Sequence, residues 1–273
     1  VSDHPQLGTV LVEASGRILY LFTKDELKKS NCSGNCAMQW QPLLTVDTPT
    51  IGDGVAASYI GTIKRQDGTR QVTYNGWPLY YWSKDAKPGD ATGQNVGKVW
   101  FVVSTFGGPI QTEAAIKTAQ NPQLGTFLVE ASGRALYLYT RDEPNKTNCT
   151  GNCAMLWQPL LTVGKPSVGD GLTASLLGTI TRPEGGTQVT YNGWPLYYWY
   201  LDAKPGDTLG QNVGRVWFVL SPDGKAIPAA AAAPPAGGGE ATGAGPGSLP
   251  GGRRPLPPPH LPACVCHHDG RAG

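Results

Sequence analysis

Two nearly identical stretches decide the fold: residues 74–90 read YNGWPLYYWSKDAKPGD, and residues 191–207 read YNGWPLYYWYLDAKPGD. Asn-Gly is the strongest short signal for a β-hairpin, because both residues tolerate the positive φ of the turn. After the turn, Tyr80 and Trp82 are two positions apart, so a strand would place both on one face. The stretch therefore predicts a hairpin that is followed by a second turn at DAKPGD.

The chain repeats itself at two levels. The segment LGTVLVEASGRILYLFTKDE at residues 7–26 returns as LGTFLVEASGRALYLYTRDE at residues 124–143, and the same offset of 117 carries Cys32 to Cys149. Within each copy, the pattern G-x3-Y-x-[FWY]-x2-D-x9-N-x4-W occurs twice, with the two occurrences 60 residues apart. Six positions in register at four sites indicate four related units, with a period typical of repeat architectures.

The residue types of these units favour β-structure. Runs rich in branched and aromatic residues flank turns, and further strands are expected at 59–64 and 99–104. Helix is limited to a single expected turn at Cys36–Trp40. The predicted fold class is all-β, made of tandem antiparallel β-hairpin repeats. The sequence leaves open whether the four units pair into two small barrels or sandwiches, or close as a propeller-like ring.

The repeats also suggest domain boundaries. We expect a first β domain at 1–106, a linker at 107–123 and a second β domain at 124–221. Residues 222–273 are rich in Pro, Gly and Ala, and they lack the apolar side chains that would offset the entropy of ordering. An extended tail is therefore predicted there.

Charge and hydropathy limit the function classes. A formal net charge of +2 over 273 residues, with Lys and Arg scattered, argues against a nucleic-acid partner. No apolar stretch is long enough to span a bilayer, so no transmembrane segment is expected. The plentiful Gly, Pro, Thr, Tyr and Trp and the paired cysteines favour an extracytoplasmic protein, with a leader expected to have been removed before Val1.

A short motif connects the four units to a known family. The segments YLFTKD, YYWSKD, YLYTRD and YYWYLD all fit Y-x-[FWY]-x-x-D, and the chain also contains CSGNCAMQW, a C-x3-C-A-x2-W segment. In these features it resembles a bacterial family of predicted lipoproteins and secreted repeats. The resemblance implies a cell-envelope location and brings no assigned reaction. The residues of the motif are Tyr20, Phe22, Asp25, Tyr80, Trp82, Asp85, Tyr137, Tyr139, Asp142, Tyr197, Trp199 and Asp202.

The paired cysteines predict disulfides. Cys32 with Cys36 and Cys149 with Cys153 would each close a short loop in an oxidising compartment. The sister half-repeats lack these cysteines, so the fold does not depend on them. The alternative is a metal site of four thiolates, which would require the two loops to meet in a reduced state.

The motif residues have structural and functional interpretations. An Asp three residues past the second aromatic residue of the motif typically accepts backbone N–H bonds from the turn that follows; the alternative is a carboxylate cluster for Ca²⁺ or acid–base chemistry. The strand aromatics suit a hydrophobic core, with a glycan-stacking surface as the alternative. Trp77 and Trp194, directly after the Asn-Gly turn, are better candidates for exposure than the strand aromatics.

Histidine is scarce and lies outside the repeat cores, which argues against a His-based catalytic triad there. The candidate metal ligands are at the two ends of the chain, where soft thiolates beside imidazoles suit copper or zinc; a terminus without function is the alternative. These ligands are His4, Cys264, Cys266, His267 and His268.

Two functional hypotheses follow. The first is a non-catalytic cell-envelope module whose rigid repeats bind other envelope proteins or an envelope polymer. The second is an extracytoplasmic copper-dependent redox enzyme of the superoxide-dismutase type, with copper as its cofactor. The absence of closely spaced histidines in a β scaffold favours the first.

Overall fold

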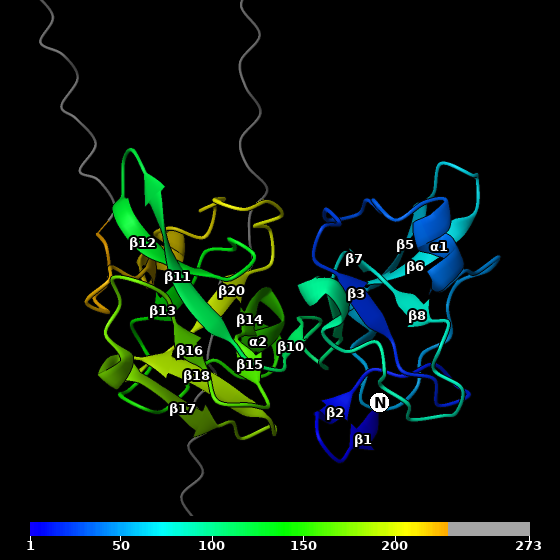
Figure 1. Ribbon diagram of the computed structural model, residues 1–273, viewed down its shortest axis with the longest axis horizontal. Coiled ribbons are helices and arrows are strands. Elements are labelled where there is room, and N and C mark those ends of the chain that lie inside the picture. Colours follow the sequence, from blue (N-terminus) through cyan, green and yellow to red (C-terminus); the bar gives the residue numbers. More distant parts are fainter. Residues whose placement is uncertain (229–273) are drawn as a thin grey trace, which may run out of the picture. The chain divides into compact units, whose positions relative to one another are not determined.

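The structure, a computed structural model, describes residues 1–228 and confirms an all-β fold of short, mostly antiparallel strands (Figure 1). The tail predicted from residue 222 onward lies outside the described residues from position 229. The elements of the first copy are β1 (Ser2–His4), β2 (Gly8–Val10), β3 (Tyr20–Phe22), α1 (Asn35–Gln39), β4 (Trp40–Pro42), η1 (Ala57–Tyr59), β5 (Ile60–Lys64), β6 (Arg70–Tyr74), β7 (Trp77–Pro78), β8 (Tyr80–Trp82), η2 (Val96–Lys98) and β9 (Trp100–Val102).

The second copy repeats this order with additional strands. Its elements are β10 (Ile110–Gln111), β11 (Ala115–Asn121), β12 (Gly125–Glu130), β13 (Tyr137–Tyr139), α2 (Asn152–Leu156), β14 (Trp157–Pro159), β15 (Leu161–Thr162), β16 (Ser167–Val168), η3 (Ala174–Leu176), β17 (Leu177–Thr181), β18 (Thr187–Tyr191), β19 (Trp194–Pro195), β20 (Tyr197–Trp199), η4 (Val213–Arg215) and β21 (Trp217–Val219).

A four-stranded antiparallel sheet is the centre of each copy. Its strand order is β4-β8-β3-β9 in the first copy and β14-β20-β13-β21 in the second. In the first copy β3 comes from one half-repeat, and both of its neighbours, β8 and β9, come from the other. The strands of the two half-repeats therefore alternate in pairing, and neither half-repeat builds the sheet alone.

The Asn-Gly turn has the predicted geometry. Asn75 and Gly76 have φ of 50° and 81°, and Tyr74 pairs with Trp77 across the turn, so β6 and β7 form the expected hairpin. Asn192 and Gly193 repeat these positive φ values in the second copy. A residue with a branched Cβ would resist this conformation.

Residues 107–123, where we expected a linker, contain β10 and β11. Strand β10 pairs in parallel with β15, and β11 forms a hairpin with β12 (Figure 1) while also pairing in parallel with β16. This segment is therefore integrated into the sheets of the second copy. The difference arises because the two parallel pairings, Ile110 with Leu161 and Ala115 with Ser167, join residues about 50 positions apart, which local composition does not reveal.

The sheets within residues 1–228 have open strand orders, and none closes into a barrel. The four-stranded sheet is nevertheless strongly curled. Trp40 lies on the edge strand β4 and Trp100 on the opposite edge strand β9, yet their rings stack with centroids 3.9 Å apart. The concave face of the curled sheet therefore encloses the aromatic side chains.

Candidate functional site

The tyrosine and the aspartate of the recurring motif bind each other across half-repeats. Tyr20 donates its hydroxyl hydrogen bond to Asp85 at 2.6 Å, and Tyr80 donates to Asp25 at 2.7 Å. Each tyrosine thus reaches the aspartate of the other half-repeat. The second copy has the same exchange at 2.7 Å in both pairs, Tyr137 with Asp202 and Tyr197 with Asp142.

The sheet register explains this exchange. Tyr20 and Tyr80 are paired residues of the antiparallel strands β3 and β8. Because these strands are antiparallel, the turn that follows β3 lies close to β8, and the turn that follows β8 lies close to β3. An Asp in that turn is therefore within reach of the opposite tyrosine.

The second carboxylate oxygen of each aspartate holds the loop that follows it. Asp25 accepts the backbone N–H of Asn31 at 2.7 Å, and Asp85 accepts that of Thr92 at 3.0 Å. In the second copy the donors are the N–H groups of Asn148 to Asp142 at 2.6 Å and of Leu209 to Asp202 at 2.9 Å. Both oxygens of each carboxylate are thus occupied by protein donors, which suits a structural role rather than a cation site.

Burial sets the protonation of these groups. It raises the pKa of Asp25 to about 7 and the pKa values of Asp142 and Asp202 to about 6, although hydrogen bonds from Tyr80, Tyr197 and Tyr137 oppose the shift. Burial, together with the neighbouring carboxylate, also raises the pKa of each of the four motif tyrosines above its ordinary value. The tyrosines therefore remain protonated donors at neutral pH.

These pKa shifts predict a protein that is more stable in mild acid. Between about pH 4 and pH 7 the folded state holds protons on Asp25, Asp142 and Asp202 that the unfolded state has released, so the free energy of unfolding falls as pH rises through this window. We expect urea midpoints to decrease from pH 5 to pH 7.5 and then to level off. Asp25→Asn should make this dependence shallower, and a midpoint that increases over the same range would contradict the prediction.

Four aromatic rings form a continuous stack inside each curled sheet. In the first copy Trp82, Trp40, Trp100 and Phe22 follow one another with centroids 3.9 to 4.2 Å apart. Tyr20 meets Trp40 of this stack edge-on, and Tyr80 meets Trp100 in the same way. The corresponding rings of the second copy are Trp199, Trp157, Trp217 and Tyr139, at 3.8 to 4.2 Å.

The stacked tryptophans are core residues, since Trp40, Trp82 and Trp100 are all buried. A sugar ring would therefore have no access to their faces. The expectation that Trp77 is exposed is wrong, because its side chain is only 3 % exposed. Arg134 of the second copy lies over the ring of Trp77 at 5.3 Å. Its counterpart Trp194 is half-buried.

The two expected disulfides are present, joining Cys32 to Cys36 and Cys149 to Cys153. These bonds consume all four sulfur atoms, so the alternative of a four-thiolate metal site does not fit the structure. A buried arginine holds each disulfide loop from the inside. Arg65 donates to the carbonyl of Cys32 at 2.7 Å, and Arg182 donates to that of Cys149 at 2.8 Å.

The candidate metal ligands are not brought together within residues 1–228. The Nδ1 atom of His4 accepts the backbone N–H groups of Gln6 and Leu7 at 3.2 Å each. No group of three or more His, Cys, Asp or Glu side chains suited to a metal ion occurs in this range. Cys264, Cys266, His267 and His268 lie outside the described residues, so the copper hypothesis stays a prediction. Metal analysis of the purified protein, followed by a superoxide assay with and without chelator, would test it.

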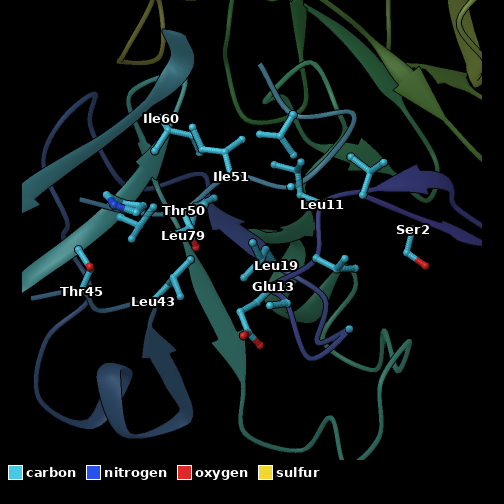
Figure 2. A pocket seen from close by; sticks show the side chains of 18 of the residues that line it. Ser2, Leu11, Glu13, Leu19, Leu43, Thr45, Thr50, Ile51, Ile60 and Leu79 are labelled. Atoms are coloured by element: carbon cyan, nitrogen blue, oxygen red, sulfur yellow. The ribbon is translucent and has the colours of Figure 1, made fainter. Parts of the chain in front are cut away.

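An apolar groove opens on the first copy, with a volume of about 820 Å³ (Figure 2). We call it the first-copy groove. Its walls are mainly aliphatic, and the loop at 48–53 contributes to its lining. The branched aliphatic residues that line it are Val1, Leu11, Val12, Leu19, Leu43, Leu44, Ile51, Val55, Ile60, Val72 and Leu79.

The second copy has the same aliphatic positions but covers them. Leu44 is 47 % exposed in the first-copy groove, whereas its equivalent Leu161 is 5 % exposed, because β10 pairs with β15 over it. Ala114 and Ile116 are fully buried in the same core as Leu128 and Leu160, the equivalents of Leu11 and Leu43. Sequence analysis missed the groove, since QPLLTV is written identically at 41–46 and 158–163.

Comparison with known proteins gives one result for this chain. Four segments match a family described as "Secreted repeat of unknown function", at residues 2–44, 61–104, 118–161 and 178–221. Each segment contains one motif tyrosine and ends just after the strand that begins at the tryptophan of the repeat pattern. No curated protein and no solved structure matches the chain. The helices of residues 1–228 are all too short to span a membrane.

Proposed function

The chain belongs to this family of secreted repeats, and from that premise we propose that it is a non-catalytic binding and assembly module of the cell envelope. The family and the two disulfides indicate an extracytoplasmic protein, because disulfides persist in oxidising compartments. Within that setting, the module presents a rigid surface to another envelope component.

The observation that supports the proposal most directly is the first-copy groove, which has the form that a strand fills in the second copy. In the register of 117 residues Val1 corresponds to Thr118, so this is the place where residues ahead of Val1 would run. Exposed contiguous apolar surface on a secreted protein commonly marks an interaction site. Here the groove lies beside a backbone that is ready to pair: the loop at 48–53 carries no strand, although its equivalent in the second copy contains β16. An aliphatic groove with an unpaired backbone edge suits an extended peptide segment better than a polyhydroxylated polymer.

The repeated motif supports a scaffold role rather than catalysis. Its tyrosines and aspartates bind each other, and its tryptophans fill the core. The curled sheet therefore holds the groove in a fixed shape, which lowers the entropic cost of binding.

Binding of an extended strand can be tested directly with a segment of this chain. A fluorescent peptide with the sequence IQTEAAIKT, copied from residues 110–118, should bind the full-length protein saturably. Leu44→Arg places a charge in the groove and should weaken binding at least about tenfold. Val46→Arg is the matched control, because Val46 is 87 % exposed and does not line the groove.

Fluorescence anisotropy would measure both variants, with a scrambled peptide as reference. Absence of saturable peptide binding, or equal loss in both variants, would contradict the proposal. Co-sedimentation with purified wall polymer that is unaffected by Leu44→Arg would instead indicate a polymer partner at another surface.

A further inference from the structure

Helix α2 of the second copy packs into the core of the first copy. Ala154 and Met155 are buried in the same hydrophobic cluster as Tyr74 and Phe106. The side chain of Asn75 donates to the carbonyl of Met155 at 2.6 Å, and this bond is buried as well. These residues form a joint between the two copies.

The disulfide between Cys149 and Cys153 constrains this helix at its beginning. Cys149 is buried, whereas Cys153, which belongs to α2, is half-buried. The helix has five residues, and its N-cap residue Gly151 provides no side-chain hydrogen bond. A helix of this length is not stable by itself. Its conformation therefore depends on the disulfide and on the contacts with the first copy.

The sister half-repeat shows what the same loop forms without a disulfide. Leu209 and Val213 occupy the positions of the two cysteines there. That loop forms η4, a 3-10 turn in which Asn212 and Gly214 both have positive φ. In the first copy, η2 has the same conformation. The α-helical form of the loop thus occurs where the disulfide does.

A buried arginine connects the disulfide loop to the first copy a second time. Arg182 donates to the carbonyl of Cys149 at 2.8 Å, and its guanidinium carbon lies over the ring of Phe106, 5.0 Å from the ring centroid. A change of the backbone at Cys149 would therefore also alter the group that packs on Phe106.

The first copy has a matching disulfide that makes no such contact within residues 1–228. Cys32 and Cys36 are joined with the same spacing. Helix α1, however, has no buried residue, and Met38, the equivalent of Met155, is 68 % exposed. The two disulfides differ in that only the second lies at the joint.

We propose that the Cys149–Cys153 disulfide is a redox switch that keeps the two copies docked, and that its reduction by a dithiol lets them separate. A thiolate of the dithiol attacks Sγ of Cys153 and displaces Cys149 as a thiolate, which takes up a proton. The second thiol of the dithiol then displaces Cys153. Two electrons pass to the protein, and the dithiol becomes a disulfide.

The physical basis of the switch is the freedom that the loop gains. Without the cross-link the segment 149–153 has more conformations, and only the α-helical one places Met155 in the first copy. For a loop this short, the change should raise the undocked population about tenfold. The proposal concerns the joint and is independent of the first-copy groove.

Hydroxyl-radical footprinting of the full-length chain, read by mass spectrometry, tests the switch. Met155 and Trp77 are buried at the joint, and their equivalents Met38 and Trp194 are more exposed and serve as references. In Cys149→Ala/Cys153→Ala, modification of Met155 and Trp77 relative to these references should rise about tenfold. Wild-type protein that was reduced with dithiothreitol and then separated from it should behave in the same way.

The disulfide of the first copy provides the matched control. Cys32→Ala/Cys36→Ala should keep the wild-type ratios, because that disulfide does not lie at the joint. An equal rise in both double variants would show a general effect of losing a disulfide, and unchanged ratios in both would show that the joint does not respond to either. Each of these results would overturn the proposal.

The stacked tryptophans of the second copy distinguish separation from unfolding. Trp157 and Trp217 are buried and should stay unmodified in Cys149→Ala/Cys153→Ala. Their modification would show that the disulfide stabilises the second copy itself. Faster modification of Met155 while Trp77 stays protected would show that only the loop opens. Both outcomes count against a switch at the joint.

A variant on the first-copy side opens the joint with both disulfides intact. Asn75→Gly removes the donor to the Met155 carbonyl and keeps a residue that tolerates the φ of 50° at this turn. It should also raise the modification of Met155. Asn192→Gly is its control and should not, because the Asn192 side chain donates to Asp223 within the second copy. Unchanged Met155 in both Asn75→Gly and Cys149→Ala/Cys153→Ala would refute the switch.

Discussion

Asp202→Ala is expected to lower the free energy of unfolding by about 3 kcal/mol, since it leaves the buried hydroxyl of Tyr137 and the partly buried N–H of Leu209 without an acceptor. The carboxylate of Asp202 accepts the hydroxyl of Tyr137 at 2.7 Å and the backbone N–H of Leu209 at 2.9 Å. Asp202 is 1 % exposed and the bond from Tyr137 is buried, so water does not readily replace the carboxylate at the tyrosine hydroxyl. Urea denaturation followed by tryptophan fluorescence would measure the loss.

A matched control and a mutant cycle make this result specific. Asp207 also accepts two backbone N–H groups, from Ala203 and Lys204, but in a more exposed turn, so Asp207→Ala should cost a small fraction of the Asp202→Ala effect. Tyr137→Phe removes the other partner of Asp202. The double variant should be less destabilised than the sum of the two single variants, by about 0.5–3 kcal/mol. Additive effects would show that the tyrosine and the aspartate are not coupled.

The contact of each motif aspartate with the loop that follows it can be predicted from the sequence. Its contact with the tyrosine of the other half-repeat cannot. An Asp at a strand end commonly accepts N–H groups of the next turn, and the bond from Asn31 to Asp25 spans six residues. The tyrosine partner of that Asp is Tyr80, 55 residues away, and it belongs to the other half-repeat. Only the register of β3 against β8 brings the two together. The motif therefore predicts a strand and a turn, while its reason for recurring lies in the pairing of two half-repeats.

Segments with identical sequences in the two copies also have different neighbours in the structure. Residues 74–82 and 191–199 are the same, yet Trp77 is buried while Trp194 is half-buried. The difference comes from the second copy, since Asn75 donates to the carbonyl of Met155 at 2.6 Å and Arg134 covers the Trp77 ring. A second case is Leu44, which is 47 % exposed, while its equivalent Leu161 beside β10 is 5 % exposed. Repeats predict the shape of each copy, but the segment between them decides which surfaces of the copies are covered.

Gly210→Ala is expected to destabilise the protein by about 3 kcal/mol, because the added methyl group has no space. Its Cβ would lie 2.8 Å from the Trp157 ring and 2.9 Å from both Trp199 and Tyr137. These side chains are buried in the stacked core and cannot move aside without disturbing one another. The backbone N–H of Gly210 also donates to the Tyr137 hydroxyl at 3.2 Å, so a shift of the loop would weaken the bond between Tyr137 and Asp202.

Two further glycines test whether the effect comes from the aromatic stack. Gly93→Ala in the first copy should cause a similar loss, since its Cβ would lie 2.7 Å from Trp40 and 3.0 Å from Trp82. Gly52→Ala is the control: its Cβ would meet nothing within 4 Å, so the change should leave the urea midpoint unaltered or slightly higher. Loss of stability in Gly52→Ala equal to that in Gly210→Ala would show that the loss does not require contact with the aromatic rings. An unchanged midpoint in both Gly93→Ala and Gly210→Ala would show that the stacked rings tolerate the added methyl group.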